Sequence, residues 1–243
     1  MKKIAYQQMY ENELSHGWYL GTRRHLIKTL KQNCQSNSRI LDAGAGSGGT
    51  IKLLKKAGFK NVTGIEKSDI AIDYARKRNI SVKKGDIEKL PFKNDSFDVV
   101  ICLDVLYHQG VEPAIALKEF ARVLKKEGLL YLQEPAYNFL KSRHDWAIST
   151  GRRFIKNQIK KLLNFAGFKI LKLSYFNTVM FIPIGIKRLV DKFSKKDEKS
   201  SDVGSLNSVL NGLIESSLKF ESSLIRFINL PFGLSIICLA KKN

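Results

Sequence analysis

The feature that most constrains this chain is a glycine-rich segment joining a predicted strand to a predicted helix. The segment reads Asp42-Ala43-Gly44-Ala45-Gly46-Ser47-Gly48; a short buried strand is predicted over 39–43, leading into it, and an amphipathic helix begins over 51–57. Glycine lets the backbone bend sharply and approach a ligand without a Cβ in the way. The helix that follows directs its free N–H groups at the turn. We therefore predict a ligand-binding turn that includes Gly44, Gly46 and Gly48.

Acidic residues recur at the ends of the predicted strands that follow. Strands and helices are predicted to alternate over 39–43, 51–57, 61–66, 69–77, 80–84, 97–103, 112–125 and 128–134. Such alternation predicts a parallel sheet with helices on both faces. Asp42, Glu66, Asp86 and Asp104 fall at or just after strand ends, and parallel strands present these ends at one edge, where ligands bind. Glu66 is suited to hold the hydroxyls of a ribose.

These motifs resemble those of the class I S-adenosylmethionine (SAM)-dependent methyltransferases. The similarity covers the glycine-rich turn, Gly85-Asp86-Ile87 with Leu90-Pro91-Phe92, the strand 97–102 with the segment 104–108, and the turn 122–130. The resemblance implies a Rossmann-like, doubly wound, mostly parallel seven-stranded sheet, with SAM as the cofactor. It also implies that Asp42, Gly44, Gly46, Gly48, Glu66 and Asp104 bind SAM. Asp86 would accept a hydrogen bond from the adenine amino group, and Ile87 would offer its backbone N–H.

Residues 1–38 precede the first strand and are predicted to be helical, with a break near Gly17 and Gly21. The segment 16–24 resembles the N-terminal cap of small-molecule methyltransferases. In that interpretation Trp18 or Tyr19 shields the sulfonium by cation–π attraction, and Arg23 or Arg24 pairs with the methionine carboxylate. The alternative is that the aromatic residues only anchor this helix on the domain.

Candidate acceptor-side residues follow the fourth and fifth strands. His108 and His144 are candidates for a general base, and Tyr107, Tyr137 and Arg152 for contact with the acceptor. His108 has a structural alternative, in which it hydrogen-bonds the backbone at a helix start. No Cys or His residues have metal-ligand spacing, so we predict a metal-independent enzyme.

About the last third of the chain contains an insertion between the two final strands, expected at 167–175 and 231–240. We expect a cap at 1–38, a core at 39–176 and 229–243, and a helical insertion at 177–228 with a mobile linker at about 194–205. The stretch 177–193 is apolar and carries Lys187, Arg188 and Lys192 near its end, and 206–228 has a helical apolar stripe. The insertion is predicted to cover the acceptor, with packing on the core or contact with an anionic membrane as alternatives.

The net charge of +20, from 42 basic and 22 acidic residues, indicates attraction to anions. The leading hypothesis is methyl transfer to an oxygen or nitrogen of a small or lipid-linked acceptor, and the resemblance loosely suggests a surface-polysaccharide intermediate. RNA or protein methylation is the alternative that the charge favours. The segment 103–106 lacks the N/D-P-P-Y type of motif used for exocyclic amines of nucleic acid bases. We expect a cytoplasmic protein, with peripheral contact at the inner membrane face as an option.

Overall fold

Seven strands form a single sheet in the computed structural model, which describes residues 3–142, 145, 148–193 and 208–243. The strand order is β3-β2-β1-β4-β5-β7-β6, and β7 runs antiparallel to both of its neighbours, β5 and β6. The strands are β1 (Arg39–Ala43), β2 (Asn61–Glu66), β3 (Val82–Lys84), β4 (Phe97–Leu103), β5 (Leu124–Pro135), β6 (Phe168–Phe176) and β7 (Ser235–Lys242). The predicted fold class, a mostly parallel seven-stranded sheet, is confirmed.

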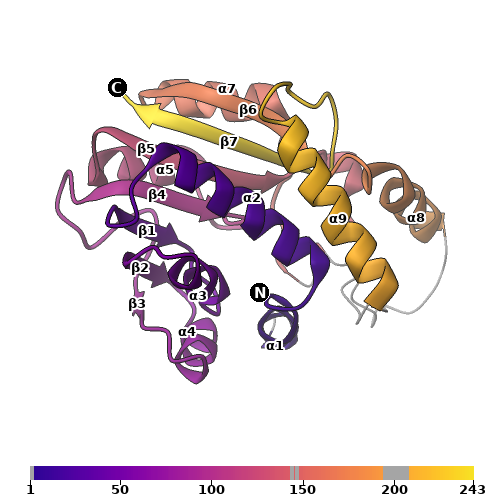
Figure 1. Ribbon diagram of the computed structural model, residues 1–243, viewed down its shortest axis with the longest axis horizontal. Coiled ribbons are helices and arrows are strands. Elements are labelled where there is room, and N and C mark those ends of the chain that lie inside the picture. The colour runs from indigo at the N-terminus through magenta and orange to yellow at the C-terminus, as the bar shows by residue number, and fades with distance from the viewer. Residues whose placement is uncertain (1–2, 143–144, 146–147, 194–207) are drawn as a thin grey trace.

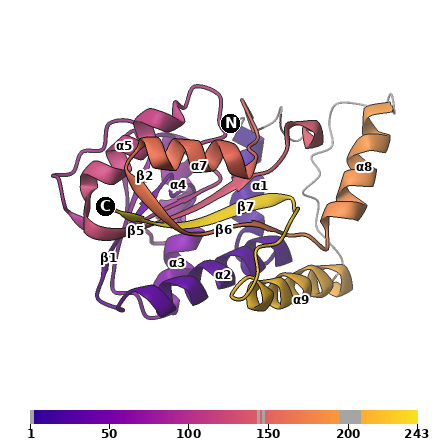
Figure 2. The same cartoon turned by 90° about the horizontal axis from the view of Figure 1, so that it is seen from above.

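Helices cover both faces of this sheet, with α5 and α7 on one face and α2 and α9 on the other (Figures 1 and 2). The helices are α1 (Lys3–Asn12), α2 (Gly17–Asn33), α3 (Gly49–Lys56), α4 (Asp69–Lys77), α5 (Pro113–Val123), η1 (Asn138–Leu140), α7 (Lys156–Phe165), α8 (Phe181–Phe193) and α9 (Ser208–Leu224). Because both faces are covered, a central strand such as β4 is an almost continuous apolar run rather than an alternating one. None of the helices in the described ranges is long and apolar enough to cross a membrane.

The ends of several elements differ from the predicted ones. The break in the N-terminal region lies between α1 and α2, whereas Gly17 begins α2 and Gly21 lies inside it. The strand β5 begins at Leu124, directly after α5, and the last strand begins at Ser235. Glycine and proline mark turns in a sequence only statistically, and contacts far along the chain decide where an element ends.

The contact between α2 and α9 explains why glycines occur within a helix. The backbone N–H of Gly17 donates to Asn211 Oδ1 over 2.5 Å, and Asn211 Nδ2 donates to the carbonyl of Ser15 over 2.9 Å. A Cβ at Gly21 would lie 2.5 Å from Leu218 Cδ1, so only glycine permits this approach. Two polar pairs flank the contact: His25 with Ser222, and Arg24 with Glu215. The second helix of the predicted insertion is therefore packed closely on the N-terminal helix.

Candidate active site

A cavity of about 870 Å³ opens at the sheet edge where β1, β2 and β4 end. This edge is where open α/β sheets bind ligands. Side chains from α1, α2, α8 and α9 complete the wall, so both ends of the chain contribute to it. Pockets for drug-sized ligands typically hold about 300–1,000 Å³. The cavity is therefore near the upper end of that range.

The glycine-rich turn forms one side of the cavity in a conformation that needs glycine. Gly44 and Gly46 have φ of +88° and +53°, in the left-handed region that L side chains rarely adopt. A Cβ on Gly44 would lie 2.5 Å from Val105 Cγ2, and the N–H of Gly46 donates to Glu66 Oε2 over 3.0 Å. The turn is thus held against the loops that follow β2 and β4. Gly48 has φ of +78° and precedes α3, and it is absent from the described cavity wall.

Asp42 brings an unpartnered polar atom to the cavity. The residue is 2% exposed, and its Oδ2 atom has no hydrogen-bond partner among the described residues. Burial raises the pKa of its carboxyl to about 7, with Glu13 and Glu66 acting in the same direction and Arg23 opposing them. A cationic ligand group would satisfy this atom. The site therefore fits SAM, which carries an ammonium and a sulfonium.

Arg23 from α2 reaches the beginning of α3 across the cavity. Its Nε donates to Thr50 Oγ1 over 3.1 Å, and its guanidinium carbon lies 5.5 Å from the centre of the Tyr19 ring and 6.0 Å from that of Trp18. All four side chains line the cavity. A guanidinium in this position is suited to pair with a ligand carboxylate.

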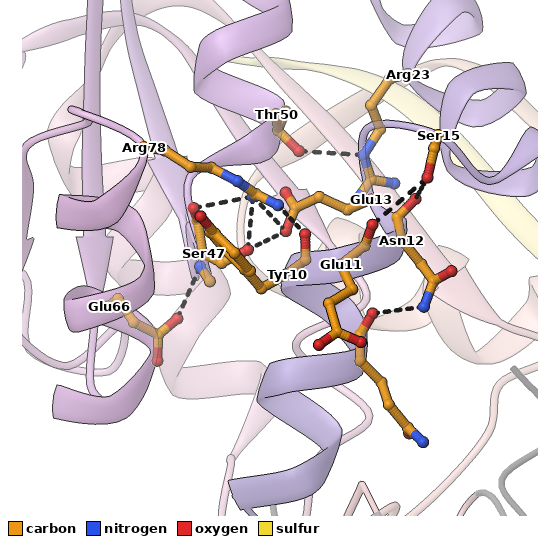
Figure 3. A network of polar contacts seen from close by, with 12 residues as sticks. Tyr10, Glu11, Asn12, Glu13, Ser15, Arg23, Ser47, Thr50, Glu66 and Arg78 are labelled. Atoms are coloured by element: carbon orange, nitrogen blue, oxygen red, sulfur yellow. Dashed lines mark hydrogen bonds and ion pairs between the residues drawn. The ribbon is translucent and has the colours of Figure 1, made fainter. Parts of the chain in front are cut away.

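A buried ion pair fastens the N-terminal segment to the glycine-rich turn (Figure 3). Glu13 Oε2 lies 2.9 Å from Arg78 Nη1, and both side chains are less than a tenth exposed. Ser47 Oγ donates to Glu13, and Arg78 donates to the hydroxyl and carbonyl oxygens of Ser47 over 2.7 and 3.1 Å. Arg78 also donates to the carbonyl of Tyr10, and its guanidinium carbon lies 4.3 Å from the centre of the Tyr10 ring. The network joins α1, the turn and the residue after α4.

Asp86 and the neighbouring Ile87 also line the cavity. Burial raises the pKa of the Asp86 carboxyl, but the hydrogen bond from Lys67 and that from the N–H of Glu88 outweigh it, and the net shift is downward. The Lys67 Nζ to Asp86 Oδ2 distance is 2.7 Å. Asp86 is therefore a carboxylate acceptor at neutral pH.

The loop after β4 is held by a buried glutamate from β5. Glu134 is fully buried, and its Oε1 accepts from the N–H of Val105 and of Leu106 over 3.2 and 2.8 Å. Its Oε2 accepts from the N–H of Tyr107 over 3.1 Å. Burial raises the pKa of Glu134 and Asp104 acts in the same direction, whereas the three N–H donors oppose both. Glu134 thereby fixes the segment that carries Tyr107 and His108.

Asp104, Tyr107 and His108 follow β4 and line the cavity. Burial raises the pKa of Asp104 to about 6, although Arg23 and the hydrogen bond from Gln133 oppose it. Burial lowers the pKa of His108 to about 4, so its imidazole is neutral at pH 7. The rings of Tyr107 and His108 are 4.2 Å apart.

Two predicted acceptor-side residues lie elsewhere, and one cannot be located. Tyr137 stacks on Tyr175 at 5.0 Å, and the N–H of Arg152 donates to the Tyr107 carbonyl over 3.1 Å. Neither belongs to the described cavity wall, which instead includes Arg153. His144 lies outside the described residues.

Arg153 forms a buried ion pair that the sequence did not indicate. Its Nε and Nη2 donate to the two carboxylate oxygens of Asp145 over 2.8 and 3.1 Å, and both side chains are nearly inaccessible. Asp145 also accepts from the N–H of Ser142 over 2.7 Å. The pair borders the cavity, and the N–H of Arg153 donates to Asn138 Oδ1 of η1 over 2.9 Å, so two parts of the chain after β5 are held together.

Several known proteins are similar to this chain in sequence. A model described as "Methyltransferase domain" matches residues 41–132. The Bacillus subtilis protein YrhH, named as a methyltransferase, is 30% identical over 60% of this chain and 94% of its own length. The chain belongs to the class I SAM-dependent methyltransferases.

One further relative of this methyltransferase agrees with the assignment, and one solved structure has the same fold. The uncharacterized methyltransferase YcgJ of Bacillus subtilis is 32% identical over 51% of this chain, and the match spans only 50% of YcgJ. The structure of a SAM-dependent methyltransferase from Thermotoga maritima has a TM-score of 0.60 and 20% identity, with all of both chains covered. At that identity the structural likeness concerns the fold alone.

The raised pKa of Asp42 predicts that cofactor affinity of this methyltransferase depends on pH. Below pH about 7 the carboxyl is protonated in the free protein, and a cationic ligand must displace that proton. We expect the Kd for S-adenosylhomocysteine, whose ammonium group is retained, to rise up to about tenfold per pH unit below this pKa. Calorimetric titrations from pH 8 to pH 5 test this.

The variant Asp42→Asn is the control, since Asp104 also titrates in this range. It should bind more weakly at pH 8 and lose most of the pH dependence. A Kd for the unaltered protein that stays constant from pH 8 to pH 5 would contradict the prediction.

The same raised pKa also affects the stability of the free protein. Between pH about 4 and about 7 the folded state holds the Asp42 proton more tightly than the unfolded state does, so Asp42 lowers the free energy of unfolding as the pH rises through this range.

Proposed function

We propose that the protein transfers the methyl group of SAM to an oxygen or nitrogen atom of a small or lipid-linked acceptor. The observation that carries the proposal is the unpartnered, buried Oδ2 of Asp42 in a cavity that continues between α8 and α9. SAM supplies an electrophilic methyl group on a sulfonium, which leaves as a neutral thioether.

The proposed cofactor half of the cavity has groups for five distinct tasks. Asp42 would hold the ammonium, Glu66 the ribose hydroxyls, and Asp86 with the N–H of Ile87 the adenine. Arg23 would pair with the carboxylate, and Trp18 would cover the sulfonium. Gly44 and Gly46 would allow the close approach. Each task matches the charge and hydrogen-bonding capacity of the group named.

In the acceptor half the protein has to align the acceptor atom and receive its proton. Alignment of the reacting atoms can supply a large part of the reduction in the activation barrier of methyl transfer. The neutral imidazole of His108 is proposed to accept the proton of a hydroxyl or ammonium acceptor, and Tyr107 to contact the acceptor. We also propose that residues 177–228 act as the cover of this half.

A membrane-facing position is part of this proposal. Ile182 and Ile186 of α8 and Val209 and Leu213 of α9 are each 59–71% exposed, and the chain carries a net charge of +20. Apolar side chains on a basic protein favour contact with an anionic bilayer. The same charge supports the second candidate, methylation of RNA or of an acidic protein.

The deciding experiment uses SAM labelled in its methyl group. The protein is incubated with separated cell fractions (lipid extract, soluble small molecules, RNA and protein), and Asp42→Asn provides the background. Label in the lipid or small-molecule fraction is the expected result. Label confined to RNA or protein would overturn the proposed acceptor class, and no label in any fraction would overturn methyl transfer itself.

The variant Asp86→Ala tests the adenine position. We expect its Kd for S-adenosylhomocysteine to rise about tenfold, the loss of one hydrogen bond to a carboxylate. Asp69→Ala is the matched control, because Asp69 is also a carboxylate paired with a lysine, Lys84 at 2.6 Å, and is not among the residues of the described wall. Equal affinities for Asp86→Ala and the unaltered protein would contradict the assignment.

A further inference from the structure

Asn177 follows β6 and brings another buried polar atom to the wall of the cavity. The residue is 1% exposed, and its Oδ1 atom has no hydrogen-bond partner among the described residues. Buried polar groups in native proteins are almost always hydrogen-bonded, because an unpaired group loses its contacts with water and gains nothing in exchange. The exception at Asn177 therefore points to a partner that is not part of the chain.

The backbone around Asn177 is held in place by its neighbours. Asn177 has φ of +63°, in the left-handed region that asparagine tolerates better than most residues do. The next two N–H groups, of Thr178 and Val179, donate to the buried carboxylate of Glu221 over 2.9 and 2.8 Å. The Asn177 carbonyl accepts from the N–H of Leu234 over 3.3 Å. The amide is therefore positioned in advance, which lowers the entropic cost of binding a partner there.

The position of Asn177 along the sheet places it in the proposed acceptor half of the cavity. Because β7 is antiparallel to both β5 and β6, β6 ends at the same edge of the sheet as β4 and β5. The proposed cofactor groups Asp42 and Glu66 lie near the ends of β1 and β2, on one side of β4. Asn177 lies on the other side, three strands from β4, which is roughly 14 Å at a strand spacing of about 4.8 Å. It is therefore remote from His108, where methyl transfer is proposed to occur.

Ser235 adds a hydroxyl to the wall next to Asn177. It is the first residue of β7, pairs in register with Phe176 of β6, is 3% exposed and lines the cavity. An amide and a hydroxyl are neutral groups that can both donate and accept hydrogen bonds. Met180 and Leu234, close to them in the sequence, line the cavity with apolar side chains. This part of the wall is thus suited to a neutral polar group rather than to an ion.

From this arrangement we infer that Asn177 recognises the acceptor, and that its Oδ1 accepts a hydrogen bond from an O–H or N–H group distant from the methylated atom. The inference rests on the proposed function and narrows its acceptor class to molecules that carry such a donor. A molecule without the donor would leave the Oδ1 atom buried and unpaired. Sites built around a polar group reject analogues that lack the matching partner for this reason.

The test uses the cell fraction that accepts label from methyl-labelled SAM, diluted in steps at saturating SAM. The amount of fraction that gives half of the maximal rate replaces KM, and the maximal rate replaces kcat. Asn177→Gly removes the amide, and it should keep the fold because glycine adopts φ of +63° freely. We expect this variant to need about tenfold more of the fraction for half of the maximal rate, since one hydrogen bond to the acceptor is lost. Its maximal rate and its Kd for S-adenosylhomocysteine should each change by less than about threefold.

Two further variants locate the effect. Asn79→Gly is the matched control, because Asn79 also has a left-handed φ, of +59°, but is exposed and lies outside the described wall. It should leave all three quantities unchanged. Asn177→Asp keeps the acceptor oxygen and nearly the same shape, so its half-maximal amount should stay within about threefold of that of the unaltered protein.

An unchanged half-maximal amount in Asn177→Gly would overturn the inference, because the acceptor would then not use the amide. A fall in the maximal rate alone, or a parallel loss of S-adenosylhomocysteine binding, would overturn it in favour of a role in the fold or in the chemical step. A loss in Asn177→Asp as large as that in Asn177→Gly would show that the acceptor does not donate to Oδ1.

The labelling experiment separates this inference from the proposed function. If a fraction accepts label equally well from Asn177→Gly and from the unaltered protein, the inference alone fails. If no fraction accepts label from the unaltered protein, the proposed function fails, and the inference fails with it.

Discussion

Replacing Glu134 by glutamine is expected to slow methyl transfer by about 10- to 100-fold, because misplacing a reacting group by about 1 Å costs up to that factor. Glu134 accepts three backbone N–H groups from residues 105–107. A glutamine amide has one oxygen acceptor, and its NH₂ group would oppose one of these donors. The segment that carries Tyr107 and His108 should therefore shift, while the proposed cofactor-binding groups on β1, β2 and α2 stay in place.

Turnover and cofactor Kd measured on the same preparation distinguish this role from general damage to the fold. We expect kcat to fall, whereas the Kd for S-adenosylhomocysteine should change by less than about threefold. A tenfold change in Kd would correspond to about 1.4 kcal/mol of binding free energy. Glu127→Gln is the control, since Glu127 is an exposed strand residue paired with Lys241. A parallel loss of cofactor binding in Glu134→Gln would show that Glu134 supports the whole site rather than the loop after β4.

The second large effect is that two glycine-to-alanine substitutions should change the free energy of unfolding in opposite directions. Gly21→Ala should lower the free energy of unfolding by about 1–3 kcal/mol, because its Cβ would lie 2.5 Å from Leu218 Cδ1 in the α2–α9 contact. Gly212→Ala should raise it by about 0.5–1 kcal/mol, since alanine favours a helix and nothing lies within 4 Å of that Cβ. Urea unfolding of both variants measures this.

Gly21→Ala should also weaken cofactor binding, because α2 carries Trp18 and Arg23. An equal gain of stability in both variants would mean that α2 and α9 are not closely packed in solution. Such a result would also remove the physical link between the proposed cofactor and acceptor halves of the cavity.

One physical reason explains why the sequence predicted the sheet and why the proposed cofactor-binding acids line one cavity. Strands that are buried on both faces are apolar runs, and polar residues at their ends stand out against them, as Asp42, Glu66 and Asp104 do. The rule that parallel strands end at one edge then brings these acids together. These residues line the cavity in the structure, whereas their tasks toward SAM remain predictions.

Other parts of the site depend on contacts between residues far apart in the chain. Glu13 and Arg78 carry no local pattern that connects them. Glu134 had a signal that could have been used: it is an acid two residues after the apolar run 129–132 of a buried strand. Gly17 and Gly21 were interpreted as a helix break, although a four-residue spacing of glycines is equally typical of close helix packing. Tyr137 has a left-handed backbone conformation, with φ of +58°. No sequence pattern indicated this conformation, so the path of the chain after β5 could not be predicted.

The Glu13 carboxylate has a consequence for the choice of cofactor. It contacts Gly49 at the beginning of α3, so the positive end of this helix already faces a negative charge supplied by the chain. Dinucleotide-binding proteins leave that position open for a pyrophosphate. Here the Glu13 side chain, paired with Arg78, occupies that position instead, so we expect a pyrophosphate to be excluded from it.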